Sequence, residues 1–215
     1  MRNFYLDSQR YEVVEKLLRV TGERAMRAEV LDSCSAKSRN NALSFAIAEC
    51  QEIMVERLLD RGCDVNTRVL AEGIPLLCLA ISNVASHLID PEATTAARNI
   101  VDKLLRHEKI KLFAKMADGR SALSLATEFH LPSVVQFLVT HGADVNERRL
   151  DGVTPLSCAV YNDDIELTQI LIDGGAYCDT VLPNGQLLIA MTRNKVIKNL
   201  LENGISRGQT RSTII

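Results

Sequence analysis

The sequence predicts an all-α fold built from stacked helix–turn–helix repeats, and three observations support this fold class. Similar segments begin at Asp118-Gly119, Asp151-Gly152 and Asn184-Gly185, which are equally spaced along the chain. A fixed period of this size is typical of stacked repeats and not of one closed globule. Apolar residues recur within each segment at three- and four-residue spacing, as on one face of a helix. Aromatic residues make up only 4% of the chain, so the core must be aliphatic, which favours helical layers over a β-sandwich.

Two helices are expected in each repeat. The segments 43–46, 123–126 and 156–159 match one another and predict the first helices. Second helices are predicted by apolar runs at 55–59, 134–138 and 167–171. A glycine follows each second helix, at Gly62, Gly142 and Gly174-Gly175, where a left-handed residue commonly ends a helix.

The motifs in the middle of the chain indicate a known family. Residues 138–146 and the run Asp-Gly-Val-Thr-Pro-Leu at 151–156 resemble the ankyrin repeat, whose signature includes T-P-L-H-x-A. The resemblance implies a solenoid in which each helix pair carries a short β-hairpin finger. Ser157 stands where the family usually has histidine, as do Ser124 and Ser44. We expect these serines to bond to the neighbouring backbone at the start of the first helix.

Aligning the segments gives a single ankyrin-repeat domain over residues 1–205 and a C-terminal tail over 206–215. The repeats are predicted near 1–37, 38–70, 71–117, 118–150, 151–183 and 184–205. The first is irregular. The last is truncated, with a short second helix at 196–201 whose polar outer side suits a capping repeat. Asn66 and Asn146 hold the family's Asp-Val-Asn position, where a structural role in the hairpin is expected.

The third repeat, at 71–117, is longer than its neighbours, and register places the inserted residues between Ser82 and Arg98. Asp90-Pro91-Glu92 within this stretch is a helix-start signal, with a capping carboxylate, a first-turn proline and a first-turn acid. We therefore predict a long second helix from about Pro91 to about His107. Pro132 is expected to have the same first-turn role in the fourth repeat.

Composition and motifs exclude several classes of function. The net charge is −2, which favours neither nucleic acid nor an anionic membrane as a partner. The longest apolar run, 74–81, is too short to cross a bilayer, and the N-terminus has no long apolar stretch typical of a secretory signal. We expect an intracellular, cytoplasmic protein, with the nucleus or delivery into a host cell as alternatives.

No pattern in the chain indicates catalysis. Phosphate-binding glycine motifs are absent, and His107-Glu108 is followed at position 111 by lysine, so no helical zinc pair forms. We expect His141 to complement a helix C-terminus and Asp163-Asp164 to cap the second helix of repeat five. No two of the six cysteines have C-x-x-C spacing, so reduced and mostly buried thiols are expected. They are Cys34, Cys50, Cys63, Cys78, Cys158 and Cys178. We predict no enzymatic activity, no cofactor and no metal.

In ankyrin proteins the finger tips and the exposed side of the first helix line a concave groove. The resemblance therefore implies partner contacts from the finger residues Arg68, Leu70, Lys115, Arg120, Arg148, Leu150 and Asp151. It also implies contacts from Glu128, Phe129, Tyr161 and Asn162 on the first helices. Phe129 and Tyr161 are candidate hot spots because aromatics are scarce here; the alternative is that Phe129 folds over the turn between helices. The finger edge has a basic excess, which indicates either an acidic partner or an ordinary solvated edge.

These observations predict a non-enzymatic module that binds another protein through the groove and acts as an adaptor, inhibitor or scaffold. We expect the free protein to be monomeric. The alternatives are a regulatory or targeting subunit of an enzyme complex, or an effector that acts on a host protein. A self-assembling protein would follow if the end repeats left apolar surface uncovered. The last four residues, 212–215, fit strand addition to a carboxylate-binding domain or a plain disordered tail.

Overall fold

The computed structural model describes residues 41–69, 72–87 and 90–211. They fall into two compact units, which divide between Ile110 and Lys111. The irregular first repeat predicted at 1–37 lies outside the described residues, as do Cys34 and residues 212–215. Nothing in the described chain is both long enough and apolar enough to be a membrane-spanning helix.

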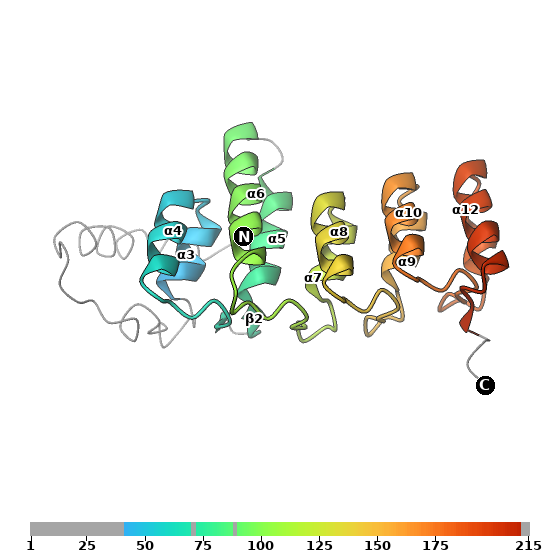
Figure 1. The fold of residues 1–215 in the computed structure, drawn as a ribbon, viewed down its shortest axis with the longest axis horizontal. Coiled ribbons are helices and arrows are strands. Elements are labelled where there is room, and N and C mark those ends of the chain that lie inside the picture. The colour runs from blue at the N-terminus through green and yellow to red at the C-terminus, as the bar shows by residue number, and fades with distance from the viewer. Residues whose placement is uncertain (1–40, 70–71, 88–89, 212–215) are drawn as a thin grey trace. The chain divides into compact units, whose positions relative to one another are not determined.

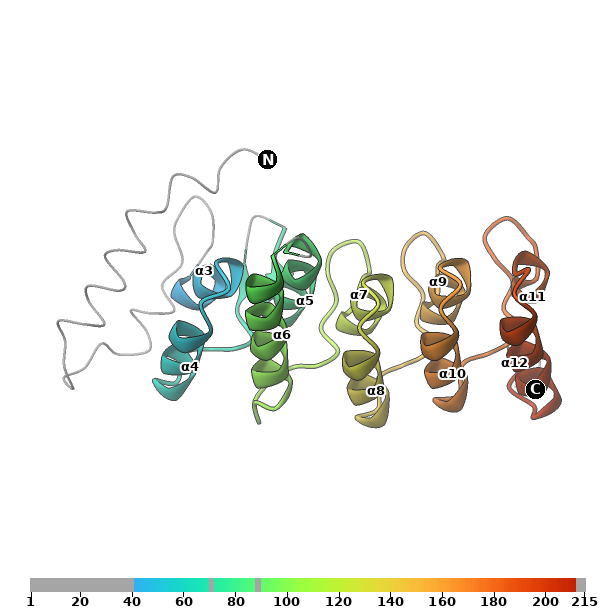
Figure 2. The same ribbon diagram turned by 90° about the horizontal axis from the view of Figure 1, so that it is seen from above.

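The first compact unit contains two helix pairs joined by a finger. Helices α3 (Ala42–Ala48) and α4 (Glu52–Asp60) precede α5 (Leu76–Ser86) and α6 (Pro91–Leu105). Strands β1 (Arg68–Val69) and β2 (Ile74–Pro75) pair antiparallel, with Val69 opposite Ile74. The first helices α3 and α5 pack together, and so do the second helices α4 and α6 (Figure 2). The predicted helix pairs and hairpin finger are confirmed in this unit.

The long second helix predicted for the third repeat is α6. It begins at Pro91, and the Asp90 carboxylate caps it by accepting from the backbone N–H groups of Glu92 and Ala93. It ends at Leu105, just before the predicted His107, and has 15 residues against nine in α4. Because α5 has 11 residues against seven in α3, the extra length of this repeat extends both of its helices.

The second compact unit contains three helix pairs. They are α7 (Ala122–Glu128) with α8 (Pro132–Thr140), α9 (Pro155–Tyr161) with α10 (Ile165–Asp173), and α11 (Leu188–Met191) with α12 (Lys195–Ser206). Within this unit α8, α10 and α12 lie side by side, and α9 packs against both α7 and α11 (Figure 1). Pro132 occupies the first turn of α8, as predicted.

The core is aliphatic, as the composition predicts. Its largest fully buried side chains are leucines and isoleucines on the helices, including Leu43, Ile81, Leu104, Leu138 and Leu171. Burying a side chain of this size contributes about 1.5–3 kcal/mol, so packing between neighbouring helix pairs stabilises each compact unit.

Reciprocal capping boxes begin the first helices at Asn41/Ser44, Ser121/Ser124 and Thr154/Ser157. In the last, the Ser157 hydroxyl accepts from the Thr154 N–H at 2.9 Å and donates to the Thr154 carbonyl at 2.8 Å. Both residues are buried, so water does not replace these bonds. The predicted role of Ser44, Ser124 and Ser157 is confirmed.

Replacing Ser157 with alanine is therefore expected to lower the free energy of unfolding by about 1 kcal/mol. Urea denaturation followed by circular dichroism measures the change. Ser133→Ala is the matched control because Ser133 is an exposed serine in the first turn of α8. Equal midpoints for the two variants would contradict the capping role.

The last repeat differs from its prediction in two ways. The second helix, predicted to be short and to span 196–201, is instead the 12-residue α12. The short helix of this repeat is the first one, α11, which has four residues. Helix α12 continues because Gly204 fits against Cys178, where a larger residue would clash. Beyond it, residues of the predicted tail pack back on repeat five: the Cys178 N–H donates to the Gln209 carbonyl at 2.9 Å, and the Gln209 side chain donates to the Ile172 carbonyl at 2.7 Å.

Candidate functional site

An ion-pair network joins two fingers to the end of α7 in the second compact unit. The Glu128 carboxylate lies 3.1 Å from the Arg149 guanidinium and 3.9 Å from that of Arg120. Arg120 also pairs with Asp118 at 2.7 Å, and Arg149 pairs with Asp151 at 3.4 Å. The network therefore fixes the side chains of both fingers against the first helix of repeat four.

Local bonding and burial shift two ionisable groups in and beside this network. The pKa of Asp118 lies below its ordinary value because the Arg120 backbone N–H donates to the carboxylate, and the Arg120 side chain adds to the effect. Asp118 therefore stays ionised at neutral pH. Burial raises the pKa of the Cys158 thiol on α9, and the nearby Glu128 raises it further. The Cys158 thiol is therefore neutral at physiological pH, and a neutral thiol is a weak nucleophile.

Two apolar side chains are exposed in the second compact unit, one at the end of repeat four and one on the first helix of repeat five. Leu150, at the finger tip, is 80% exposed and Tyr161, the last residue of α9, is 73% exposed. Tyr161 occupies the helix position that Glu128 holds one repeat period earlier. Asn162 and Arg148 are also exposed, and Arg148 donates to the Gly152 carbonyl at 3.3 Å. We define the finger face as Asp118, Arg120, Glu128, Arg148, Arg149, Leu150, Asp151, Tyr161 and Asn162.

The remaining predicted contact residues lie elsewhere. Arg68 is exposed in the first compact unit and donates to the Gly73 carbonyl at 2.8 Å. Leu70 lies outside the described residues. Lys115 pairs with Glu147 at 3.2 Å. Phe129 is half-buried as the C-terminal cap of α7, which fits the turn-covering alternative better than the exposed hot spot.

The pairing of charges also alters the interpretation of the finger edge. Its predicted basic excess is balanced within the second compact unit, because Arg120, Arg149 and Lys115 each pair with a carboxylate. Arg149, which links Glu128 to Asp151, is not among the predicted contact residues. The repeat period does not indicate this role, because the residue one period earlier is Met116.

Two side chains that could in principle take part in catalysis, His141 and Asp164, have structural roles at helix ends. His141 caps α8, its Nδ1 lies 2.8 Å from the Phe137 carbonyl, and its ring stacks on that of Phe137. Asp164 caps α10 through the Leu167 N–H and also contacts His130 at 2.8 Å. The placement of His141 and the capping role of Asp164 are confirmed, whereas Asp163 precedes the cap and has a positive φ of 57°. No group of three or more potential metal ligands occurs in the described part of the chain.

The five described cysteines are free thiols. Cys63, Cys78 and Cys178 are buried, and Cys50 and Cys158 are half-buried, in agreement with the prediction for these five. Burial raises the pKa of Cys178 to about 11, so this thiol is neutral at physiological pH.

Comparison with known proteins identifies the repeats. A family model described as ankyrin repeats (3 copies) matches residues 92–184. Residues 92–184 therefore contain ankyrin repeats. A crystal structure of an ankyrin repeat domain from Acinetobacter baumannii AYE superposes with a TM-score of 0.70, at 18% identity, over 91% of this chain and 93% of that one. The predicted family and fold class are thereby confirmed, and ankyrin repeats are generally a non-enzymatic fold for protein–protein interaction.

Two relatives show how this chain compares with longer proteins. A Rickettsia bellii protein named for its ankyrin repeats is 28% identical over 140 residues, which is 62% of this chain and 36% of that protein. The human BCL-6 corepressor-like protein 1 is 25% identical over 130 residues, 60% of this chain and 7% of its own length. The chain thus matches about a third or less of the length of these relatives.

Proposed function

We propose that this chain is a non-enzymatic interaction module that binds a partner protein through the finger face and acts as an adaptor, inhibitor or scaffold. The observation that carries the proposal is the exposure of Leu150 and Tyr161 beside the ion-pair network. Single exposed apolar residues are ordinary. An exposed tyrosine and an exposed leucine on adjacent repeats, next to fixed charges, fit the pattern of a hot spot with a polar surround.

The electrostatics of the face favour a partner segment without strong net charge. Its three acids are Asp118, Glu128 and Asp151, and its three cations are Arg120, Arg148 and Arg149, so the formal charges cancel. The salt bridges are formed before any partner arrives, which reduces the cost of ordering side chains on binding. Apolar burial against Leu150 and Tyr161 then supplies most of the affinity, and the charges supply register.

The charge balance and the free thiols also bear on the kind of partner and on where the protein works. The balanced charge gives no attraction for nucleic acid, and reduced thiols suit a protein that works inside a cell. We also propose that the free protein is a monomer.

Three substitutions test the face directly: Tyr161→Ala, Leu150→Ala and Arg148→Glu. Each is expected to weaken partner binding at least tenfold, or about 1.4 kcal/mol, because each removes or reverses a side chain at the contact. Arg120 is a poor choice, since a carboxylate there would face Asp118 and Glu128 and disturb the fold. The partner would first be identified by cross-linking to the wild-type protein. It would then be purified by itself and titrated with each variant by calorimetry.

The matched control is Ile53→Ala, which removes a 68% exposed side chain from α4. It is expected to leave affinity unchanged, and circular dichroism should show native helicity for all four variants. If all three finger-face variants bind as tightly as the wild type, the assignment of the face is wrong.

A further inference from the structure

Short polar side chains link successive repeats at three places in the structure. In the first compact unit the Asn66 side chain donates to the Lys109 carbonyl at 2.7 Å. In the second, the Asn146 side chain donates to the Gly175 carbonyl at 3.1 Å and accepts from the Tyr177 N–H at 2.8 Å. The Asp179 carboxylate accepts from the Arg211 N–H at 2.7 Å. Each bond reaches the loop that follows the second helix of the next repeat.

Phe113 interrupts this series. It lies one repeat period before Asn146, at the position of the linking side chain, and its ring is 52% exposed. The groups equivalent to Gly175 O and Tyr177 N are Gly142 O and Asp144 N, each also one period earlier. Phenylalanine offers these groups no donor or acceptor. Across the residues that the structure describes, neither Gly142 O nor Asp144 N takes part in a hydrogen bond.

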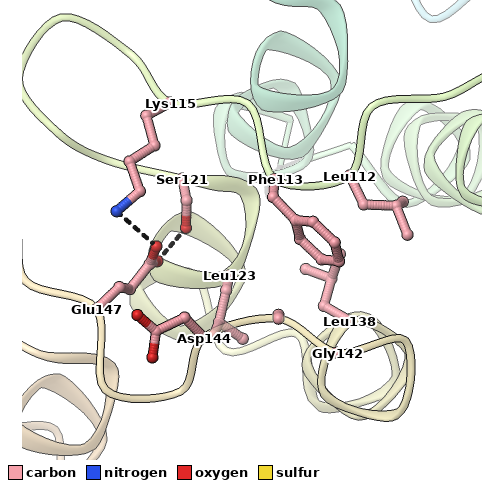
Figure 3. Close-up of a pocket in the computed structure, with 10 residues that line it drawn as sticks. Leu112, Phe113, Lys115, Ser121, Leu123, Leu138, Gly142, Asp144 and Glu147 are labelled. Atoms are coloured by element: carbon pink, nitrogen blue, oxygen red, sulfur yellow. Dashed lines mark hydrogen bonds and ion pairs between the residues drawn. The ribbon is translucent and has the colours of Figure 1, made fainter.

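A cavity of about 250 Å³ lies at this position in the second compact unit. Gly142, Ala143 and Asp144 are among the residues that line it. The ring of Phe113 points toward Leu138 (Figure 3). The apolar wall of the cavity consists of Leu112, Leu123 and Leu138. Glu147 lies beside Asp144 on the side away from Phe113, and its buried carboxylate accepts from the Ser121 hydroxyl and pairs with Lys115 (Figure 3). The cavity therefore joins an apolar surface to an unused acceptor and an unused donor.

We propose that this cavity binds the primary carboxamide of an asparagine or glutamine side chain from a partner polypeptide. The carboxamide N–H would donate to the Gly142 carbonyl, and its oxygen would accept from the Asp144 N–H. This repeats, with an external group, the pair of bonds that Asn146 makes one repeat later. The exposed ring of Phe113 and the half-buried Leu112 would cover the amide plane, whereas Leu123 and Leu138 are buried beneath them.

The same geometry discriminates against other side chains. A carboxylate has no proton to donate to Gly142 O and would meet the carboxylates of Asp144 and Glu147. An amine has no acceptor for the Asp144 N–H, and an aliphatic group satisfies neither backbone atom. The cavity is also smaller than the ~300–1,000 Å³ of typical small-molecule sites, which favours a single side chain as the occupant.

Nuclear magnetic resonance of the ¹⁵N-labelled protein tests the proposal with capped tripeptides that have a central asparagine, glutamine, aspartate or leucine. The Asp144 amide resonance is expected to shift and to saturate with the asparagine or glutamine peptide. The aspartate and leucine peptides are expected to bind at least tenfold more weakly. Equal shifts with the leucine peptide, or no saturable shift with any peptide, would overturn the proposal.

Two variants of the protein sharpen this test. Phe113→Asn places a carboxamide in the cavity from within the chain and is expected to abolish the peptide-induced shift. Tyr161→Asn is the matched aromatic-to-asparagine change on the finger face and is expected to leave it intact. Retention of the shift in Phe113→Asn would count against the site. Because the Tyr161 change affects only the finger face, failure of one site does not imply failure of the other.

Discussion

Replacing Asn146 with alanine is expected to lower the free energy of unfolding by about 1–3 kcal/mol. The Asn146 amide satisfies two backbone groups of the next repeat, Gly175 O and Tyr177 N, at 3.1 and 2.8 Å. Removing the side chain leaves both without this partner in a partly buried loop, where water replaces it incompletely. Chemical denaturation measures the change, and hydrogen exchange should show faster exchange of the Tyr177 amide.

An asparagine introduced one repeat earlier, at position 113, is expected to have the opposite effect on the free energy of unfolding. Phe113→Asn supplies the missing bonds to Gly142 O and Asp144 N and is expected to raise the free energy of unfolding by about 0.5–1.5 kcal/mol per bond. Asn199→Ala, an exposed change on α12, is the control and should stay within about 0.5 kcal/mol of the wild type. A neutral Asn146→Ala variant would contradict the linking role of this side chain.

Replacing Gly204 with alanine is expected to destabilise the last repeat by about 1–3 kcal/mol, although alanine is the better helix former. A methyl group at Gly204 would overlap the Cys178 sulfur and lie 3.0 Å from the Gln209 side-chain oxygen. Cys178 is buried, so it cannot move aside without disturbing the core. Thermal and urea unfolding of the single variant measure the loss.

A double-mutant cycle isolates the steric cause. Cys178→Ala removes the sulfur. The atom of residue 178 nearest to the methyl group of Ala at position 204 is then the β-carbon, at 3.4 Å. The double variant is therefore expected to be more stable than the sum of the single effects, by more than about 0.5 kcal/mol. Additive effects, or a Gly204→Ala variant that is stabilised by about 1 kcal/mol as propensity alone predicts, would show that the close contact is unimportant.

The sequence predicts the features that depend on local chemistry and on the repeat period. Asp90-Pro91 marks the start of α6 because a capping carboxylate and a first-turn proline act within one turn. The serines at 44, 124 and 157 bond to a residue only three positions away. Such features need no knowledge of packing between repeats.

The features that the sequence does not predict depend on contacts between repeats. The predicted end of α12 is too early, because only the close approach to Cys178 shows why Gly204 continues the helix. Phe129 is half-buried whereas Tyr161 is exposed, and this difference depends on the packing around the end of each helix. The charge balance of the finger edge likewise requires knowledge of which fingers lie beside α7.

Site-specific photo-cross-linking is the most direct test of the claim that the finger face binds a partner. A benzoylphenylalanine at position 161 keeps an exposed aromatic ring there, and the same residue at positions 53 and 196 labels exposed sites on the second helices α4 and α12. Irradiation in cell extract should give a discrete adduct of one mass from position 161 and none of that mass from 53 or 196. The same adduct from position 53 or 196, without one from 161, would contradict the account.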